Sequence, residues 1–202
     1  MRNKTIFTDI GGVLLTNGWD RKARQRAAEK FSLDLAEMEE RHHLTFDTYE
    51  IGRLSLDEYL KRTVFYGPRS CTMQDFKKFM YEQSERLPDM LELLAGIKAK
   101  CGVKVVAISN EGRELADHRV HAFNLSSVID SFVVSGYVYT RKPDASIFNL
   151  ALDISQSRPA DSIYLDDRAL FVEVAGTLGL KGIHHVDFET TIHQLAEFGL
   201  TL

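Results

Sequence analysis

The chain has little cysteine and no long apolar run. Its two cysteines, Cys71 and Cys101, lack the spacing of a metal knuckle or a Cys-x-x-Cys redox pair. No apolar stretch approaches the about 18 residues of a membrane span, and the one after residues 1–5 is too short for a signal-peptide core. We therefore expect reduced thiols and a soluble, cytoplasmic protein with no membrane partner.

Basic residues do not outnumber acidic ones. Lysine and arginine number 25 against 29 aspartates and glutamates, which gives a net charge of −4. Without a basic stripe, this balance excludes the electrostatic footprint of nucleic-acid binding. The 44% of hydrophobic residues and the length of 202 suit one globular α/β domain with an insertion, or two small domains. The composition leaves the oligomeric state open.

The most informative stretch is residues 6–15, Ile-Phe-Thr-Asp-Ile-Gly-Gly-Val-Leu-Leu. An apolar run that ends on a single acid, Asp9, and then on Gly11 and Gly12 is typical of a buried parallel strand that opens into a loop. Active sites of open α/β sheets lie at that end of the strands. On this stretch alone, an aspartate that caps a turn is an equally good explanation.

Residues 18–86 carry helical patterns and no convincing strand. The spacing predicts a helix over 21–31, and capping residues indicate further helix starts at Asp34, Ser55 and Thr72. Pro88 suits an early position of the next helix. We therefore predict an inserted helical-bundle cap domain at 18–86, with a core made of residues 1–17 and 87–202.

From residue 104 onward, apolar strands alternate with helices. We expect strands at 104–110, 131–135, 162–167 and 182–186, and a helix from about Pro143 to Leu152. Strands separated by helices in this way predict a doubly wound, parallel, Rossmann-like α/β sheet.

Polar residues follow three of these strands. They are Asp9, the pair Ser109-Asn110 and the pair Asp166-Asp167. The carboxyl ends of parallel strands share one edge, so we expect these side chains to converge. Lys142 precedes Pro143, which fits the first turn of a helix, and from that junction it can reach the acids. Each feature alone has an ordinary explanation, as a helix cap, a surface lysine or a solvated loop.

Together these residues suit phosphoryl transfer. Crowded carboxylates repel one another unless a cation lies among them, and hard oxygen ligands favour Mg²⁺. Lys142 adds positive charge for a phosphate dianion, while Ser109 and backbone N–H groups near Asn110 can hold its oxygens. Asp9 can then attack phosphorus and form an aspartyl phosphate. The sequence predicts a Mg²⁺-dependent phosphatase that acts on a small-molecule phosphate ester.

In order, these motifs resemble the haloacid dehalogenase-like hydrolase superfamily, including the run Lys-Pro-Asp-Ala-Ser-Ile-Phe from Lys142. The resemblance implies that Asp9 is the nucleophile, Ser109 binds phosphate and Lys142 steadies both. It also implies that the helical insertion selects the substrate, and the loop after Asp9 is most similar to phosphatases of sugar phosphates. The implied metal ligands are Asp9, the backbone carbonyl of Gly11, Asp166 and, through water, Asp167.

Two departures from the family pattern stand out. Most phosphatases of the superfamily carry a second Asp, the general acid and base, where this chain has Gly11. Such help is typically worth about 10²–10⁴-fold, so we expect slow turnover, or another group in its place. After Asp167, Leu170 and Phe171 replace the usual Asn or Asp, which predicts weaker support of the metal. Candidate substrate contacts in the insertion are Arg41, His42, His43 and Arg53, and one of the two histidines is a candidate proton donor.

Two alternatives remain at this point. A catalytically impaired binding protein would explain Gly11, Leu170 and Phe171. A metal-independent haloacid dehalogenase would use Asp9 to attack carbon, although it would not need the acidic pair Asp166-Asp167.

Overall fold

A computed structural model describes residues 4–202 and contains one five-stranded parallel sheet. The strand order is β3-β2-β1-β4-β5, with every neighbouring pair parallel. This confirms the predicted doubly wound α/β fold, because the chain runs outward from β1 in both directions. The strands are β1 (Thr5–Thr8), β2 (Lys104–Ser109), β3 (Ser131–Val134), β4 (Ser162–Asp166) and β5 (Lys181–His184).

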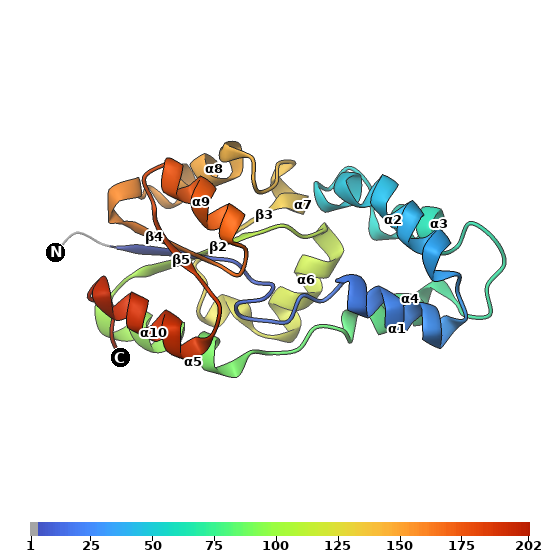
Figure 1. The fold of residues 1–202 in the computed structure, drawn as a ribbon, viewed down its shortest axis with the longest axis horizontal. Coiled ribbons are helices and arrows are strands. Elements are labelled where there is room, and N and C mark those ends of the chain that lie inside the picture. The colour runs from blue at the N-terminus through green and yellow to red at the C-terminus, as the bar shows by residue number, and fades with distance from the viewer. Residues whose placement is uncertain (1–3) are drawn as a thin grey trace.

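Helices cover both faces of the sheet (Figure 1). On one face lie α5 (Pro88–Cys101) and α10 (Phe188–Glu197), and on the other α8 (Ala145–Ser155) and α9 (Ala169–Thr177). Ile6 and Phe7 are adjacent in β1 and fully buried, yet they belong to different apolar clusters. Successive side chains point to opposite faces of a strand, so β1 is buried from both sides. The remaining helical segments of the core are α6 (Arg113–Ala122), η1 (Leu125–Ser127), α7 (Ser135–Val138) and η2 (Pro159–Asp161).

Four helices between β1 and α5 gather at one end of the molecule, opposite the C-terminus (Figure 1). We call them the helical unit. Its apolar core includes Trp19, Tyr59 and Phe76, and it also contacts Leu115 of α6. The unit therefore packs on the core near the end of the sheet that carries the predicted site. Its members are α1 (Arg21–Phe31), α2 (Leu35–Glu50), α3 (Leu56–Thr63) and α4 (Met73–Tyr81).

The predicted helix starts in this unit are confirmed. Asp34 caps α2 by accepting a hydrogen bond from Glu37 N. Ser55 and Thr72 form reciprocal capping boxes at the starts of α3 and α4. These side chains satisfy backbone N–H groups that the first turn of a helix leaves without partners.

The prediction for Pro143 is wrong. Helix α8 begins at Ala145 rather than at Pro143, and the Asp144 side chain caps it by accepting from Ser146 N. Asp144 has an extended backbone and a carboxylate that accepts a backbone N–H of the first turn, which suits the N-cap position; Pro143, one residue earlier, has no side-chain acceptor. Lys142 therefore lies in the loop between α7 and α8, two residues before the cap, and is completely buried.

Both cysteines are free thiols, Cys71 half-buried and Cys101 exposed. Among residues 4–202, no helix is both long and apolar enough to cross a membrane.

Candidate active site

Lys142 joins two of the predicted site residues. Its ammonium nitrogen lies 2.7 Å from Oδ2 of Asp166 and 3.1 Å from Oδ2 of Asp9. Lys142 and Asp166 are fully buried, and Asp9 is nearly so. A buried charge is tolerated where opposite charges and hydrogen bonds compensate it. The lysine therefore fixes the two carboxylates that follow β1 and end β4.

Asn110 holds the backbone of Lys142 in place. Its side chain accepts a hydrogen bond from Lys142 N and donates one to Lys142 O, each 2.8 Å long. The amide side chain is thus occupied in positioning the lysine. Only the backbone around Asn110 is left for the predicted phosphate contact, which stays a prediction.

Three carboxylates come together at this edge of the sheet. Asp9, Asp166 and Asp167 each offer an oxygen, and these oxygens lie within 4.8 Å of one another. Oδ1 of Asp167 is buried and has no hydrogen-bond partner within residues 4–202. An oxygen-only donor set with an unsatisfied buried oxygen suits a hard divalent cation such as Mg²⁺. The residues present therefore fit the predicted metal.

The loop after Asp9 depends on glycine at position 12. Gly12 has φ of +75°, a conformation that residues with side chains rarely adopt. In addition, a Cβ at this position would clash with the carboxylate of Asp167. Gly12 therefore lets the loop pass directly against the acidic cluster.

Burial raises the pKa of Asp9, and the neighbouring Asp166 carboxylate raises it further. Lys142 opposes both effects, as does the 2.7 Å hydrogen bond from Ile10 N to Oδ1 of Asp9. A nucleophilic carboxylate must be ionised, so additional positive charge at the cluster would favour the reactive form of Asp9.

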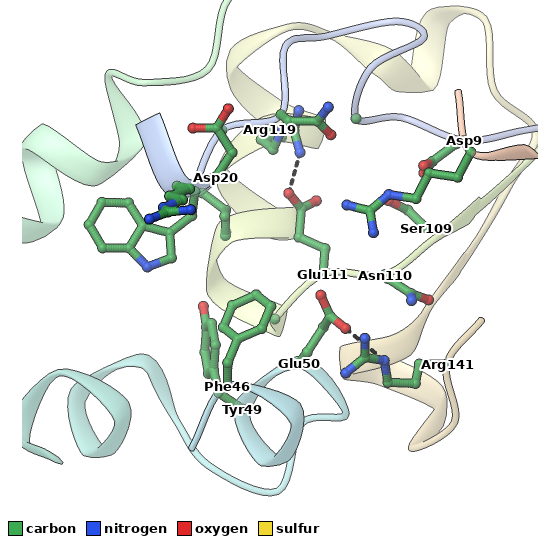
Figure 2. A pocket seen from close by; sticks show the side chains of 18 of the residues that line it. Asp9, Asp20, Phe46, Tyr49, Glu50, Ser109, Asn110, Glu111, Arg119 and Arg141 are labelled. Carbon is green, nitrogen blue, oxygen red and sulfur yellow. Dashed lines mark hydrogen bonds and ion pairs between the residues drawn. The ribbon is translucent and has the colours of Figure 1, made fainter. Parts of the chain in front are cut away.

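A cavity of about 320 Å³ lies between the sheet edge and the helical unit (Figure 2). Asp9 and Ser109 line it from the sheet, at the ends of β1 and β2. Phe46, Tyr49 and Glu50 line it from α2. The convergence predicted for Asp9, Ser109 and Asp166-Asp167 is thus present, and the helical unit supplies the opposite wall.

Of the four candidate contacts in the insertion, only His42 lines this cavity. Arg41 instead pairs with Glu37, and His43 and Arg53 are exposed. The Nδ1 atom of His42 lies 2.8 Å from the Tyr59 hydroxyl. Burial lowers the pKa of His42 to about 4, so the ring is neutral at neutral pH and is not an imidazolium that could serve as the predicted proton donor.

Sequence reasoning missed an ion pair between Arg141 and Glu50. Nε of Arg141 lies 2.9 Å from Oε2 of Glu50, which is 6% exposed. The same guanidinium pairs with Asp47, and the Ser135 hydroxyl donates a 2.7 Å hydrogen bond to the Glu50 carbonyl. Burial raises the pKa of Glu50 to about 7, against the opposing charge of Arg141. Arg141 could have been predicted as a site residue because it is next to Lys142 in the sequence, whereas nothing in the sequence distinguishes Glu50.

Phe171, one of the two predicted departures from the family pattern, places an aromatic ring at the site. The Phe171 ring lines the cavity, and its centroid lies 5.0 Å from the Lys142 ammonium. Leu170 is exposed. An apolar ring against the buried lysine excludes water and makes a cation–π contact.

These features define a doubly wound α/β protein with an acid-and-lysine site at the carboxyl edge of the sheet, faced by a helical unit. A family model described as haloacid dehalogenase-like hydrolase matches residues 3–170. The chain belongs to this hydrolase family, as its motifs predicted.

The relatives that this chain resembles include two phosphatases and a dehalogenase. A phosphorylated carbohydrates phosphatase of Thermotoga maritima is 27% identical over 123 residues, 57% of this chain and 56% of the relative. An (S)-2-haloacid dehalogenase of a Pseudomonas species is 24% identical over 103 residues, which cover 51% of this chain. The chain thus spans about half the length of these two relatives (56% and 45%). A D-ribitol-5-phosphate phosphatase of Bacteroides thetaiotaomicron is 25% identical over 202 residues, covering 88% of this chain and 89% of the relative.

Solved structures confirm the fold. A predicted haloacid dehalogenase-like hydrolase from Porphyromonas gingivalis has a TM-score of 0.76 at 19% identity, covering 97% of this chain and 98% of that one. A family enzyme from Bacteroides thetaiotaomicron, solved with magnesium and inorganic phosphate, has a TM-score of 0.75 at 18% identity, covering 94% and 98%.

Proposed function

We propose that the protein is a Mg²⁺-dependent phosphatase that hydrolyses a small phosphorylated metabolite, a sugar or polyol phosphate, through a phosphorylated Asp9. The observation that carries the proposal is the position of the Lys142 ammonium between Asp9 and Asp166, in a carboxylate cluster where Oδ1 of Asp167 has no hydrogen-bond partner within residues 4–202. A phosphate dianion needs positive charge to approach a carboxylate nucleophile, and this site concentrates it.

Each residue has a defined task in this mechanism. Asp9 attacks phosphorus through a carboxylate oxygen. Lys142 stabilises the negative charge that spreads over the phosphate oxygens in the transition state, and the Ser109 hydroxyl donates to one of them. Water then releases phosphate from Asp9.

Asp9, Asp166, Asp167 and the Gly11 carbonyl would hold Mg²⁺, which when bound adds positive charge beside the phosphate oxygens. Asp167 contributes the buried oxygen that now lacks a partner. Tyr164 donates a hydrogen bond to Asp166 and keeps that carboxylate oriented.

The cavity supports a small substrate. Its about 320 Å³ is at the lower end of the range for small-molecule sites. Its walls combine aromatic rings with arginine and glutamate side chains, a lining that suits a polar, hydroxylated ligand. We propose that residues 18–86 form a cap domain whose α2 wall selects the substrate. The phosphatases of sugar and polyol phosphates among the relatives agree with this choice.

The direct test is phosphate release from p-nitrophenyl phosphate and a panel of sugar and polyol phosphates, with Mg²⁺ and with a chelator. We expect Mg²⁺-dependent release, and a loss of at least about 10³-fold in Asp9→Asn. Asp153→Asn, on the exposed face of α8, is the matched control and should keep full activity. Full activity in Asp9→Asn, or none in the wild type, would refute the proposal.

The same preparations distinguish the alternatives. Chloride release from a 2-chloroalkanoate without Mg²⁺ would identify a dehalogenase, for which the Pseudomonas relative is the supporting observation. Ligand binding by calorimetry without turnover would identify an impaired binding protein.

A further inference from the structure

The space beside Gly11 is already occupied. A Cβ at position 11 would lie 2.7 Å from Oδ1 of Asn17 and 3.8 Å from Nη1 of Arg119. A carboxylate side chain at this position would therefore have to displace Asn17. The group that serves the leaving oxygen must come from another part of the chain.

Arg119 is paired with such a group, Glu111. Its Nη1 pairs with Oε1 of Glu111, and its Nη2 donates to the carbonyl of Thr16 in the loop after Asp9. The side chains of Arg119 and Glu111 are each only 4% exposed. The guanidinium thus fixes one oxygen of Glu111 on the same side of the loop as Gly11.

The other oxygen of Glu111 has no partner. Oε2 is buried and makes no hydrogen bond within residues 4–202, although the residue lines the cavity together with Asp9 and Ser109. Figure 2 shows Glu111 in the middle of the cavity and directed toward Arg119. A buried carboxyl oxygen without a partner is costly unless it serves a ligand. Oε2 is therefore available to a substrate atom.

The electrostatic surroundings suit proton exchange. Burial raises the pKa of Glu111, Arg119 lowers it, and the charge of Asp9 raises it again. The influence of Asp9 places the two carboxyl groups within electrostatic range of each other. A carboxyl group with a raised pKa can carry a proton closer to neutral pH than an ordinary glutamate does.

Two other acids line the cavity but have structural tasks. Oε2 of Glu50 is also buried and makes no hydrogen bond within residues 4–202, but it lies 2.9 Å from Nε of Arg141 in an ion pair. The Asp20 side chain caps α1 by accepting from Ala23 N. Asp9 is not among the main charges that act on Glu50. Glu111 is the acid that combines a fixed position, an unpartnered oxygen and proximity to Asp9.

We propose that Glu111 is the general acid and base of this site, with Arg119 as its positioning residue; this inference rests on the proposed phosphatase activity. As an oxygen of Asp9 bonds to phosphorus, the bond from phosphorus to the leaving oxygen breaks, and protonated Glu111 gives its proton to that oxygen. An alcohol leaves. Glu111 then takes a proton from water as the water oxygen bonds to phosphorus, the bond to Asp9 breaks, and inorganic phosphate and protonated Glu111 result.

The test is a leaving-group series in the wild type and in Glu111→Gln. The substrates run from 2,4-dinitrophenyl phosphate, whose leaving group needs no proton, through p-nitrophenyl and phenyl phosphate to the best alkyl substrate. In the wild type, kcat/KM should vary little with the basicity of the leaving group. In Glu111→Gln it should fall by about 10²–10⁴-fold for the alkyl ester and by less than about 10-fold for the dinitrophenyl ester.

A second measurement follows the other half-reaction. Because Glu111 also activates water, Glu111→Gln should release a burst of dinitrophenolate equal to the enzyme concentration and then stall with phosphate on Asp9. Glu92→Gln, on the exposed face of α5 and away from the cavity, is the matched control: it should show no burst and keep the wild-type dependence on the leaving group. Arg119→Lys retains a positive charge. It should show the same two effects as Glu111→Gln, a selective loss of kcat/KM for the alkyl ester and a burst of dinitrophenolate, but both should be smaller.

The possible outcomes distinguish the role of Glu111 from the phosphatase activity itself. An equal loss of kcat/KM for every leaving group, or no loss, would overturn the role of Glu111, as would a steep dependence on leaving-group basicity in the wild type. Should Glu111→Gln fail to fold, as judged by thermal unfolding, the wild-type series still tests the proposal, because a steep dependence of kcat/KM on leaving-group basicity would contradict it. Absence of phosphate release from every ester in the wild type would instead refute the phosphatase activity itself.

Discussion

Nε of Arg141 lies 2.9 Å from Oε2 of Glu50, so the residue next to the buried Lys142 is joined directly to the end of α2. This contact ties one wall of the cavity to the edge of the sheet that carries the acid cluster. The half-buried guanidinium also pairs with Asp47, and together these contacts keep the helical unit against the core.

Arg141→Ala should weaken the contact between the helical unit and the core. The ion pair is partly buried, and its removal leaves Glu50 without its partner, so we expect a loss of about 1–2 kcal/mol in substrate binding. That loss corresponds to an about 5–30-fold increase in KM for the best substrate, with a smaller effect on kcat. Arg158→Ala removes an exposed pair with Asp161 and is the control. A KM in Arg141→Ala equal to that of the control would show that Arg141 does not support substrate binding by keeping the helical unit against the core.

Metal binding should be visible without any assay of activity. If Mg²⁺ binds the folded state at the three carboxylates, excess Mg²⁺ raises the free energy of unfolding, by about 2.7 kcal/mol at 100 times its Kd. Asp167→Asn removes the negative charge of one of the three carboxylates, so the thermal shift caused by Mg²⁺ should nearly disappear. Asp153→Asn should retain it. An undiminished shift in Asp167→Asn would place the ion elsewhere.

His42 should make the protein less stable in acid. Its folded pKa of about 4 lies below the ordinary value of 6.5, so between these values the unfolded chain binds a proton that the native state does not. Stability therefore falls as the pH drops from 6.5 to 4, by about 1–2 kcal/mol once partial exposure is allowed for. His42 makes no such contribution above pH 7.

The measurement is the free energy of urea unfolding between pH 4.5 and 7.5. His42→Gln should reduce the loss in acid relative to the wild type, whereas the exposed neighbour provides the control variant His43→Gln, which should follow the wild type. Parallel curves for the wild type and His42→Gln would show that burial does not keep the imidazole neutral in the folded protein.

Restoring the usual family residue at position 11 should not help this chain. Gly11→Asp would force Cβ to within 2.7 Å of Oδ1 of Asn17, so we expect a loss of about 1–3 kcal/mol in stability and lower activity. The double variant Gly11→Asp with Asn17→Gly should recover part of both. Higher activity in the single variant, measured with an alkyl phosphate, would show that the space beside Gly11 is open.

The sheet and the acid cluster could be predicted because the signals are local. The strand that ends on Asp9, the apolar runs before Ser109 and Asp166, and the capping boxes at Ser55 and Thr72 each leave a pattern in adjacent residues. Since parallel strands end at one edge, convergence follows from topology alone.

The walls of the cavity were not predictable in the same way. Glu111, Arg119 and Glu50 acquire their importance from contacts between segments far apart in the chain, as in the hydrogen bond from Arg119 to Thr16. Arg119 and Glu50 lie on helices and Glu111 lies in the loop before α6. Charged residues in such positions usually face solvent, so their sequence positions carry no sign of burial. The start of α8 was misplaced for a local reason, because the capping strength of Asp144 exceeded the preference of Pro143 for a first turn.

The central claim is that Asp9 becomes phosphorylated. Wild-type protein is mixed with the best substrate and Mg²⁺, quenched in acid within milliseconds, digested and analysed by mass spectrometry. The account predicts that one HPO₃ group is added to the peptide that carries Asp9, that the group is lost on a longer incubation, and that it is absent from Asp9→Asn. Phosphate release at the wild-type rate with no modified peptide at any time, or with the group on another residue, would contradict it.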